Sequence, residues 1–267
     1  MPKKCKTRLG WPLGQLMVVP ELKVLYCPIA KNACTSLKRT MVRISDIPMK
    51  EEILSGGVHV MTDQNNTGIQ LCEFHVEKVN EILADTAYFT FVVIREPFER
   101  MLSAYIEKFV MNRKDKAQWR HTGAVVAAVQ GCGVDDVDYD RGITFRAFVE
   151  HVVSQPPKKL DTHWRPQFLY LEGVPYAHVY TVRDIARLTE DLSRHTGIDI
   201  EIERENVTSG KVEEVDVEGA TDMDAAQLSR FGQVSTKSFH DEDLFKMVRR
   251  FFAIDYTMYK LALIKNK

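Results

Sequence analysis

Residues 88–110 read YFTFVVIREPFERMLSAYIEKFV. The run from Tyr88 to Ile94 contains only β-branched and aromatic side chains, which is typical of a strand buried on both faces of a parallel sheet. After Arg95, Pro97 suits the first turn of a helix, and apolar side chains then recur every three or four residues. The segment therefore predicts a buried strand, a short turn and an amphipathic helix.

The same order recurs along the chain. LKVLYCPI (22–29) indicates a strand, and SLKRTMVRI (36–44) has the apolar spacing of a helix. A third pair is HVYTV (178–182) with RDIARLTEDLSRHTGI (183–198), and FKMVRRFFAIDYTMYKLALI (245–264) predicts one closing amphipathic helix. Strands that alternate with helices favour an α/β fold with a central, mostly parallel sheet flanked by helices.

Length and composition set further limits. The chain has 267 residues, 45% of them apolar, which indicates a globular protein with a substantial core. The chain has 36 Lys and Arg residues and 37 Asp and Glu residues. It therefore lacks the excess of basic residues that is typical of a general nucleic-acid-binding protein. We expect a single P-loop-like domain over residues 1–267, with an N-terminal extension at 1–20 and an acidic loop or insert at 207–226.

Targeting signals and cysteines point to a reducing compartment. Gly10, Pro12 and Pro20 interrupt the N-terminal segment before a signal-peptide core can form, and no apolar run approaches the ~20 residues of a membrane span. The five cysteines are sparse and lack a CxxC pair. We therefore expect a soluble, cytoplasmic chain with reduced thiols.

The first candidate anion site is CPIAKNACTS, residues 27–36. A loop between a strand and a helix directs backbone N–H groups and the positive end of the helix dipole toward one point. Lys31 adds an ammonium group, and Thr35 and Ser36 add hydroxyl groups. The segment predicts a phosphate site, although it lacks the glycines and the GK[ST] order of a Walker A motif.

The second candidate anion site comprises Arg95 and Ser103. Arg95 follows the buried strand, at the sheet edge where open α/β folds bind ligands, and Ser103 lies about two helical turns later. Arg95 could instead pair with Glu96 or Glu99 as a surface ion pair. Two anion sites on neighbouring strand ends favour a nucleotide with two separate phosphate groups.

The two motifs, VLYCPIAKNACTSLKRTM (24–41) and FTFVVIREPFERMLSAYIEKF (89–109), resemble the donor-binding motifs of carbohydrate sulfotransferases. LDTHWRPQ (160–167) is similar to a third motif of the Golgi enzymes that modify chondroitin, dermatan and related glycans. This resemblance implies a Golgi-lumen location only if the chain is an excised domain. The resemblance implies transfer of a sulfuryl group from 3′-phosphoadenosine 5′-phosphosulfate to a hydroxyl group of a carbohydrate or glycan-like acceptor, without a metal. Ala30 and Leu37 stand where the family usually has Pro and Trp.

The resemblance also implies roles for individual residues. The loop expected to bind the 5′-phosphosulfate comprises Lys31, Asn32, Ala33, Cys34, Thr35 and Ser36. Arg95 and Ser103 match the pair that binds the 3′-phosphate. In the transfer itself, Lys31 is the expected electrostatic catalyst.

A hydroxyl acceptor must lose a proton, and histidine is a suitable base. His59, in GGVHVMT, resembles a histidine between the donor motifs of uronyl 2-O-sulfotransferases and ranks first. His163 ranks second and His75 third. The residues expected to bind the acceptor are Asp161, His163, Trp164, Arg113 and Lys114.

Two other functions are consistent with the residues alone. A nucleotide kinase would use similar phosphate loops, but it would normally show a Walker A loop and a carboxylate for magnesium. The fold could also bind a phosphoadenosine nucleotide without catalysing a reaction. The sequence identifies neither the acceptor nor the oligomeric state.

Overall fold

The computed structural model describes residues 6–63, 67–203 and 213–265. It divides into two compact units. The first unit comprises Met1–Arg95, Gln167–Glu205 and Met258–Lys267, and the second comprises Glu96–Pro166 and Asn206–Thr257. The single-domain expectation stays a prediction.

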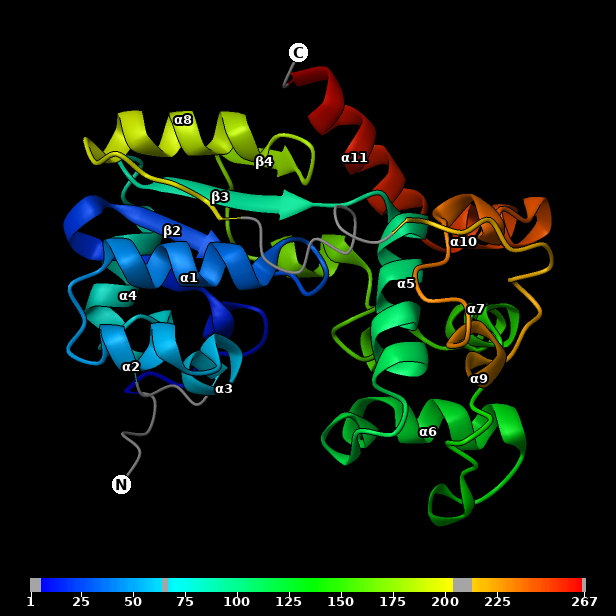
Figure 1. Cartoon of the computed structure of the whole chain (residues 1–267). Coiled ribbons are helices and arrows are strands. Elements are labelled where there is room, and N and C mark those ends of the chain that lie inside the picture. Colours follow the sequence, from blue (N-terminus) through cyan, green and yellow to red (C-terminus); the bar gives the residue numbers. More distant parts are fainter. Residues whose placement is uncertain (1–5, 64–66, 204–212, 266–267) are drawn as a thin grey trace. The chain divides into compact units, whose positions relative to one another are not determined.

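The first unit contains a four-stranded sheet in the order β1-β2-β3-β4 (Figure 1). The strands are β1 Met17–Val19, β2 Val24–Cys27, β3 Phe89–Ile94 and β4 His178–Thr181. β2, β3 and β4 run parallel, whereas β1 pairs with β2 antiparallel. β1 was not predicted, and it lies in the expected N-terminal extension, so that segment contributes buried residues to the sheet.

Helices cover both faces of this sheet, because successive side chains of a strand point to opposite sides. On one face, Tyr26 and Phe91 pack with Leu37 of α1 and Leu188 of α8. On the other face, Val92 packs with residues of α4 and α11. The helices of this unit are α1 Cys34–Ile44, α2 Lys50–Ser55, α3 Val58–Asp63, α4 Val76–Ala84, α8 Ile185–Thr196 and the C-terminal part of α11 Ala253–Lys265. The predicted α/β class with a mostly parallel, helix-flanked sheet is confirmed.

The described part of the second unit is helical. Its helices are α5 Pro97–Tyr105, α6 Trp119–Gln130, α7 Phe145–Ser154, α9 Ala225–Leu228, α10 Glu242–Phe251 and the first turn of α11. They enclose an aromatic core that includes Tyr105, Phe109, Phe145, Phe148 and Phe239. This core carries α5, the helix that was predicted to follow the buried strand.

Two helices differ from the sequence expectation. The helix after Pro97 changes to π geometry at Ile106–Met111. The predicted closing helix is two helices, since α10 ends at Phe251 and α11 begins at Ala253. The apolar pattern Leu244, Val248, Phe252, Tyr256 continues across this break, so periodicity alone could not reveal it.

The expected acidic loop lies only partly within the described residues. Residues 207–212 fall outside them, and residues 213–224 form no helix. Val217 and Ala220 are buried and Asp222 pairs with Arg146. Val217 and Ala220 of this loop therefore pack in the core of the second unit. Across the described residues, no helix is both long enough and apolar enough to cross a membrane.

Candidate active site

The loop between β2 and α1 has an unusual backbone. Lys31 and Ala33 adopt left-handed conformations, with φ of 70° and 58°. Such conformations are costly for residues other than glycine, so the surrounding structure must hold them. Ala33 is the N-cap of α1, and no side chain caps the helix there. The first N–H groups of α1 therefore lie beside a strained loop that carries Lys31.

Asn32 fixes this loop to the sheet. Its side chain is fully buried, and its Nδ2 donates to the carbonyl of Val93 (2.9 Å) and to Oε1 of Gln167 (2.6 Å). Gln167 Oε1 also accepts from the Arg95 N–H, and Gln167 Nε2 donates to the Arg95 carbonyl, both at 2.9 Å. Asn32 is therefore a buried strut of the loop, and its side chain does not face a ligand.

The two predicted donor motifs meet at one edge of the sheet. β2 and β3 are neighbouring parallel strands, so their carboxyl ends lie together. Arg95 Nη1 donates to the carbonyl of Lys31 at 3.3 Å. The structure thus brings Lys31 and Arg95 together at neighbouring strand ends.

His59 lies beside the same loop. It is the second residue of α3, and its Nε2 is 2.8 Å from Oγ1 of Thr35. Both side chains are half-buried. The first-ranked base candidate is therefore bonded to a residue of the predicted donor loop.

Two further residues of the loop are shielded. Ser36 is only 6% exposed. Burial raises the pKa of the Cys34 thiol, although the charges of Lys38 and Lys31 oppose this shift. The thiol is thus protonated at neutral pH and is no nucleophile.

In the second unit, Asp161 holds two histidines. Its Oδ1 lies 2.6 Å from Nδ1 of His163, and its Oδ2 lies 2.8 Å from Nδ1 of His121. Burial would raise the pKa of Asp161, but the hydrogen bonds from His121 and His163 hold it well below its usual range. Burial lowers the pKa of His163 despite the opposing hydrogen bond from Asp161. An ionised carboxylate therefore orients a neutral imidazole, with Nδ1 as the donor.

The turn that carries His163 is rigid. The N–H groups of Trp164 and Arg165 donate to the carbonyl of Asp161. Buried Arg100 of α5 donates to the carbonyls of Arg165 (2.8 Å) and Thr162 (3.0 Å). Trp164 is 1% exposed and packs against Phe109 and Phe148. The Trp164 ring is therefore part of the core. The expectation that Trp164 binds the acceptor is not supported by this burial.

The other candidates in the second unit are more open. Ser103 lies on α5 and is half-buried. Arg113 donates to the carbonyl of Val110, and exposed Lys114 pairs with Asp140. In the first unit, His75 is exposed at the N-cap of α4.

His121, Asp161 and His163 also offer three potential metal ligands within 4.8 Å of one another. Their N–O separations of 2.6 and 2.8 Å are those of hydrogen bonds. Ligands of a tetrahedral zinc ion, at about 2.0–2.2 Å from the metal, would lie about 3.3 Å apart. The geometry therefore favours a hydrogen-bonded group over a metal centre.

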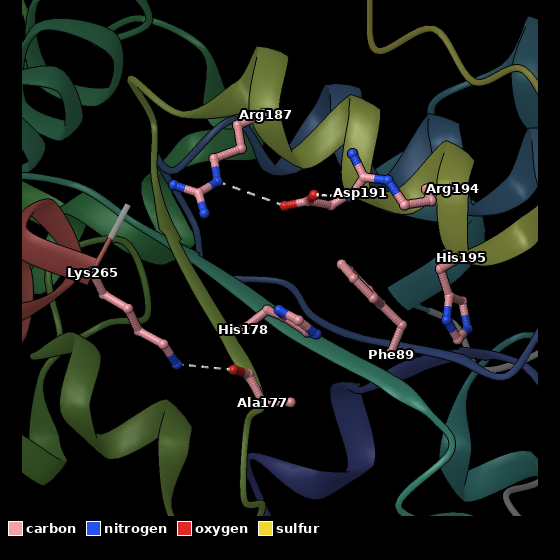
Figure 2. A pocket seen from close by; sticks show the side chains of 8 residues that line it. All are labelled: Phe89, Ala177, His178, Arg187, Asp191, Arg194, His195 and Lys265. Carbon is pink, nitrogen blue, oxygen red and sulfur yellow. Dashed lines mark hydrogen bonds and ion pairs between the residues drawn. The ribbon is translucent and has the colours of Figure 1, made fainter. Parts of the chain in front are cut away.

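A surface hollow of about 470 Å³ lies near the amino ends of β3 and β4, away from the loop edge. It is lined by Phe89, Ala177, His178, Arg187, Asp191, Arg194, His195 and Lys265 (Figure 2). Asp191 pairs with both arginines, and Lys265 donates to the Ala177 carbonyl. Its cationic side chains already have partners, so we assign this hollow no role in the site.

The sequence reasoning missed three residues. Gln167 ends the quoted motif LDTHWRPQ, and His121 ends a basic stretch around Trp119, but their partners lie 72 and 40 residues away. Lys38, inside the first motif, is buried beside α3. The only sequence signal for His121 was its position at the end of the basic segment 112–121.

The chain matches the model of the "Sulfotransferase family" over residues 14–262. It is 28% identical to carbohydrate sulfotransferase 14 of Homo sapiens over 156 residues, covering 58% of this chain and 39% of that protein. It is 27% identical to carbohydrate sulfotransferase 10 of Xenopus laevis over 160 residues, covering 59% and 43%.

A third relative, carbohydrate sulfotransferase 11 of Rattus norvegicus, is 28% identical over 175 residues, covering 62% of this chain and 47% of that protein. The matches thus span less than half the length of these relatives. No solved structure matches the chain. Because the family model covers nearly the whole sequence and both donor motifs lie within it, this chain belongs to the sulfotransferase family.

Proposed function

We propose that the protein transfers a sulfuryl group from 3′-phosphoadenosine 5′-phosphosulfate to a hydroxyl group of a carbohydrate acceptor. The observation that carries the proposal is the contact between Thr35 and His59 at 2.8 Å, beside the loop of Lys31. It joins a candidate proton acceptor to a candidate anion site. The names of the relatives support a carbohydrate acceptor.

The donor fits the charges at this edge of the sheet. Lys31 and the first N–H groups of α1 suit the 5′-phosphosulfate. Arg95, hydrogen-bonded to the Lys31 carbonyl, suits the 3′-phosphate, and Ser103 is its proposed second partner. Both phosphate groups would thus be bound by residues that follow β2 and β3.

In the proposed reaction, the acceptor oxygen attacks the sulfur and the bond from sulfur to the phosphate oxygen breaks. The acceptor proton passes to the imidazole of His59, and 3′-phosphoadenosine 5′-phosphate leaves. Charge develops on the oxygen that leaves with the phosphate, and the ammonium of Lys31 stabilises it there. Placement and electrostatics supply most of the rate, since no covalent intermediate is needed.

The second unit supplies the proposed acceptor site. His163, neutral and oriented by Asp161, can accept a hydrogen bond from a hydroxyl group at Nε2. Arg113 and Lys114 are proposed to contact anionic groups of the acceptor. His163 is also the alternative base.

The test incubates the protein with donor carrying radiolabelled sulfate and a panel of glycans, including chondroitin, dermatan and desulfated heparan. We expect label in one glycan and an equal amount of released 3′-phosphoadenosine 5′-phosphate. Label transfer from ATP in the presence of Mg²⁺ would instead support a kinase. Tight binding of the nucleotide without transfer to any acceptor in the panel would support a non-catalytic role.

A further inference from the structure

The helix that carries His59 is too short to be stable alone. α3 has six residues, Val58–Asp63, and isolated helices of this length do not persist in water. The direction of the His59 side chain therefore depends on the contacts that hold α3 against its neighbours. α3 packs beside α1, the helix that begins at the donor loop (Figure 1).

Two polar contacts connect these helices, one helical turn apart. The first joins Thr35 to His59. The second joins Lys38 to α3, where Nζ donates to Oγ1 of Thr62 at 3.2 Å and forms an ion pair with Asp63. Thr35 and Lys38 are three residues apart, and His59 is three and four residues before Thr62 and Asp63. This spacing places each set of side chains on one face of its helix.

The second contact is made by a buried ammonium group. The side chain of Lys38 is 7% exposed, whereas that of Asp63 is 60% exposed. Burial of a charged group is costly unless it is paired and hydrogen-bonded. Thr62 is fully buried and donates to the Val58 carbonyl at 2.7 Å, which leaves its oxygen free to accept from Lys38. The buried ammonium of Lys38 is thus both hydrogen-bonded, to Thr62, and paired, with Asp63.

We propose that Lys38 is a positioning residue for His59. It anchors the C-terminal turn of α3 to α1, so that α3 cannot turn about the polar contact between Thr35 and His59. His59 Nε2 then stays at the donor loop. This inference rests on the proposed function of His59 as the base, but its structural part can be measured without turnover.

The test uses Lys38→Met in the full chain, which keeps most of the apolar stem and removes the charge. The first readout is the NMR signal of the His59 ring, assigned by its loss in His59→Gln. The second is kcat beside the affinity for 3′-phosphoadenosine 5′-phosphate. Lys78→Met is the matched control, since Lys78 forms an exposed pair with Glu81 on α4.

In Lys38→Met we expect a shifted His59 signal and a kcat about 10- to 100-fold lower, because small displacements of a catalytic group are costly. Nucleotide affinity should change less than about 3-fold, since a positioning role leaves phosphate contacts intact. Lys38→Arg should recover part of the rate, and Lys78→Met should match the wild type.

An unchanged His59 signal in folded Lys38→Met overturns the proposal, whatever the rate. If Lys38→Met does not fold, Asp63→Asn removes the ion pair from its exposed side and must shift the same signal. If the wild type transfers no sulfuryl group, the proposed function fails, and the ring signal alone then decides whether Lys38 positions His59.

Discussion

The two base candidates occupy different surroundings. His59 is on a six-residue helix and contacts the neutral hydroxyl of Thr35. His163 is on a turn fixed by buried Arg100 and is bonded to the carboxylate of Asp161. The carboxylate gives His163 a fixed tautomer, whereas Thr35 gives His59 a place beside the donor loop. Orientation alone does not identify a base, because a base must also lie where the proton is released.

The largest expected effect is that of His59→Ala. If His59 accepts the proton, kcat should fall about 100- to 10,000-fold. The affinity for 3′-phosphoadenosine 5′-phosphate should be unchanged, because the proposed phosphate contacts do not include His59. Steady-state kinetics and calorimetry measure both quantities. His240→Ala, at an exposed histidine outside the candidate site, is the control.

Near wild-type turnover in His59→Ala would show that His59 is not the base and would favour His163. His163→Ala would then be expected to show the large loss in kcat. Under our assignment, His163→Ala mainly raises the KM for the acceptor. Its melting temperature must be measured as well, since His163 is part of the hydrogen-bonded group around Asp161.

The next effect is that of Lys31→Met. The ammonium should stabilise charge that develops on the leaving oxygen, so kcat should fall about 100- to 1,000-fold. Affinity for the product nucleotide should fall less, because the bound product lacks that transition-state charge. Equal losses in kcat and in affinity would show that Lys31 only binds the phosphate and does not stabilise the transition state. Lys78→Met again serves as the control.

Arg95→Ala and Ser103→Ala test the 3′-phosphate site. A charge-assisted hydrogen bond contributes about 1.5–3 kcal/mol, so Arg95→Ala should weaken 3′-phosphoadenosine 5′-phosphate about 10- to 150-fold. Ser103→Ala should weaken it about 5-fold. Neither change should affect adenosine 5′-phosphosulfate to the same extent, since that ligand lacks a 3′-phosphate. Calorimetry that finds equal losses for both ligands would contradict the assignment.

The sequence predicted those parts of the fold and site that depend on local pattern. The β3 run, α1 and α5 were evident from apolar spacing, and the adjacency of Lys31 and Arg95 followed from neighbouring strand ends. β1 was missed because three residues carry little periodicity.

Contacts between distant segments could not be predicted in the same way. The bonds of Asn32 to Gln167 and of His121 to Asp161 join residues 135 and 40 positions apart. Such pairs depend on how the elements pack, and no local pattern records the packing. The burial of Trp164 could not be predicted either, because the sequence of a motif does not show whether its aromatic residue is buried or exposed.

The smallest expected effect concerns the pH dependence of stability. Burial lowers the pKa of His163 in the folded chain below its value of about 6.5 in the unfolded chain. As the pH falls, the unfolded chain therefore takes up this proton first. The stability that neutral His163 contributes is fully present above pH ~6.5 and is lost as the pH falls toward the folded pKa.

His163→Gln removes this titration, so its melting temperature should depend less on pH between about 7 and 5 than that of the wild type. The difference between the two melting temperatures should therefore shrink as the pH falls over this range. Scanning calorimetry measures it, with His75→Gln as an exposed control. Parallel pH curves for His163→Gln and wild type would show that His163 is not held neutral by burial. His163 would then differ from His59 only in having the carboxylate of Asp161 as its hydrogen-bond partner.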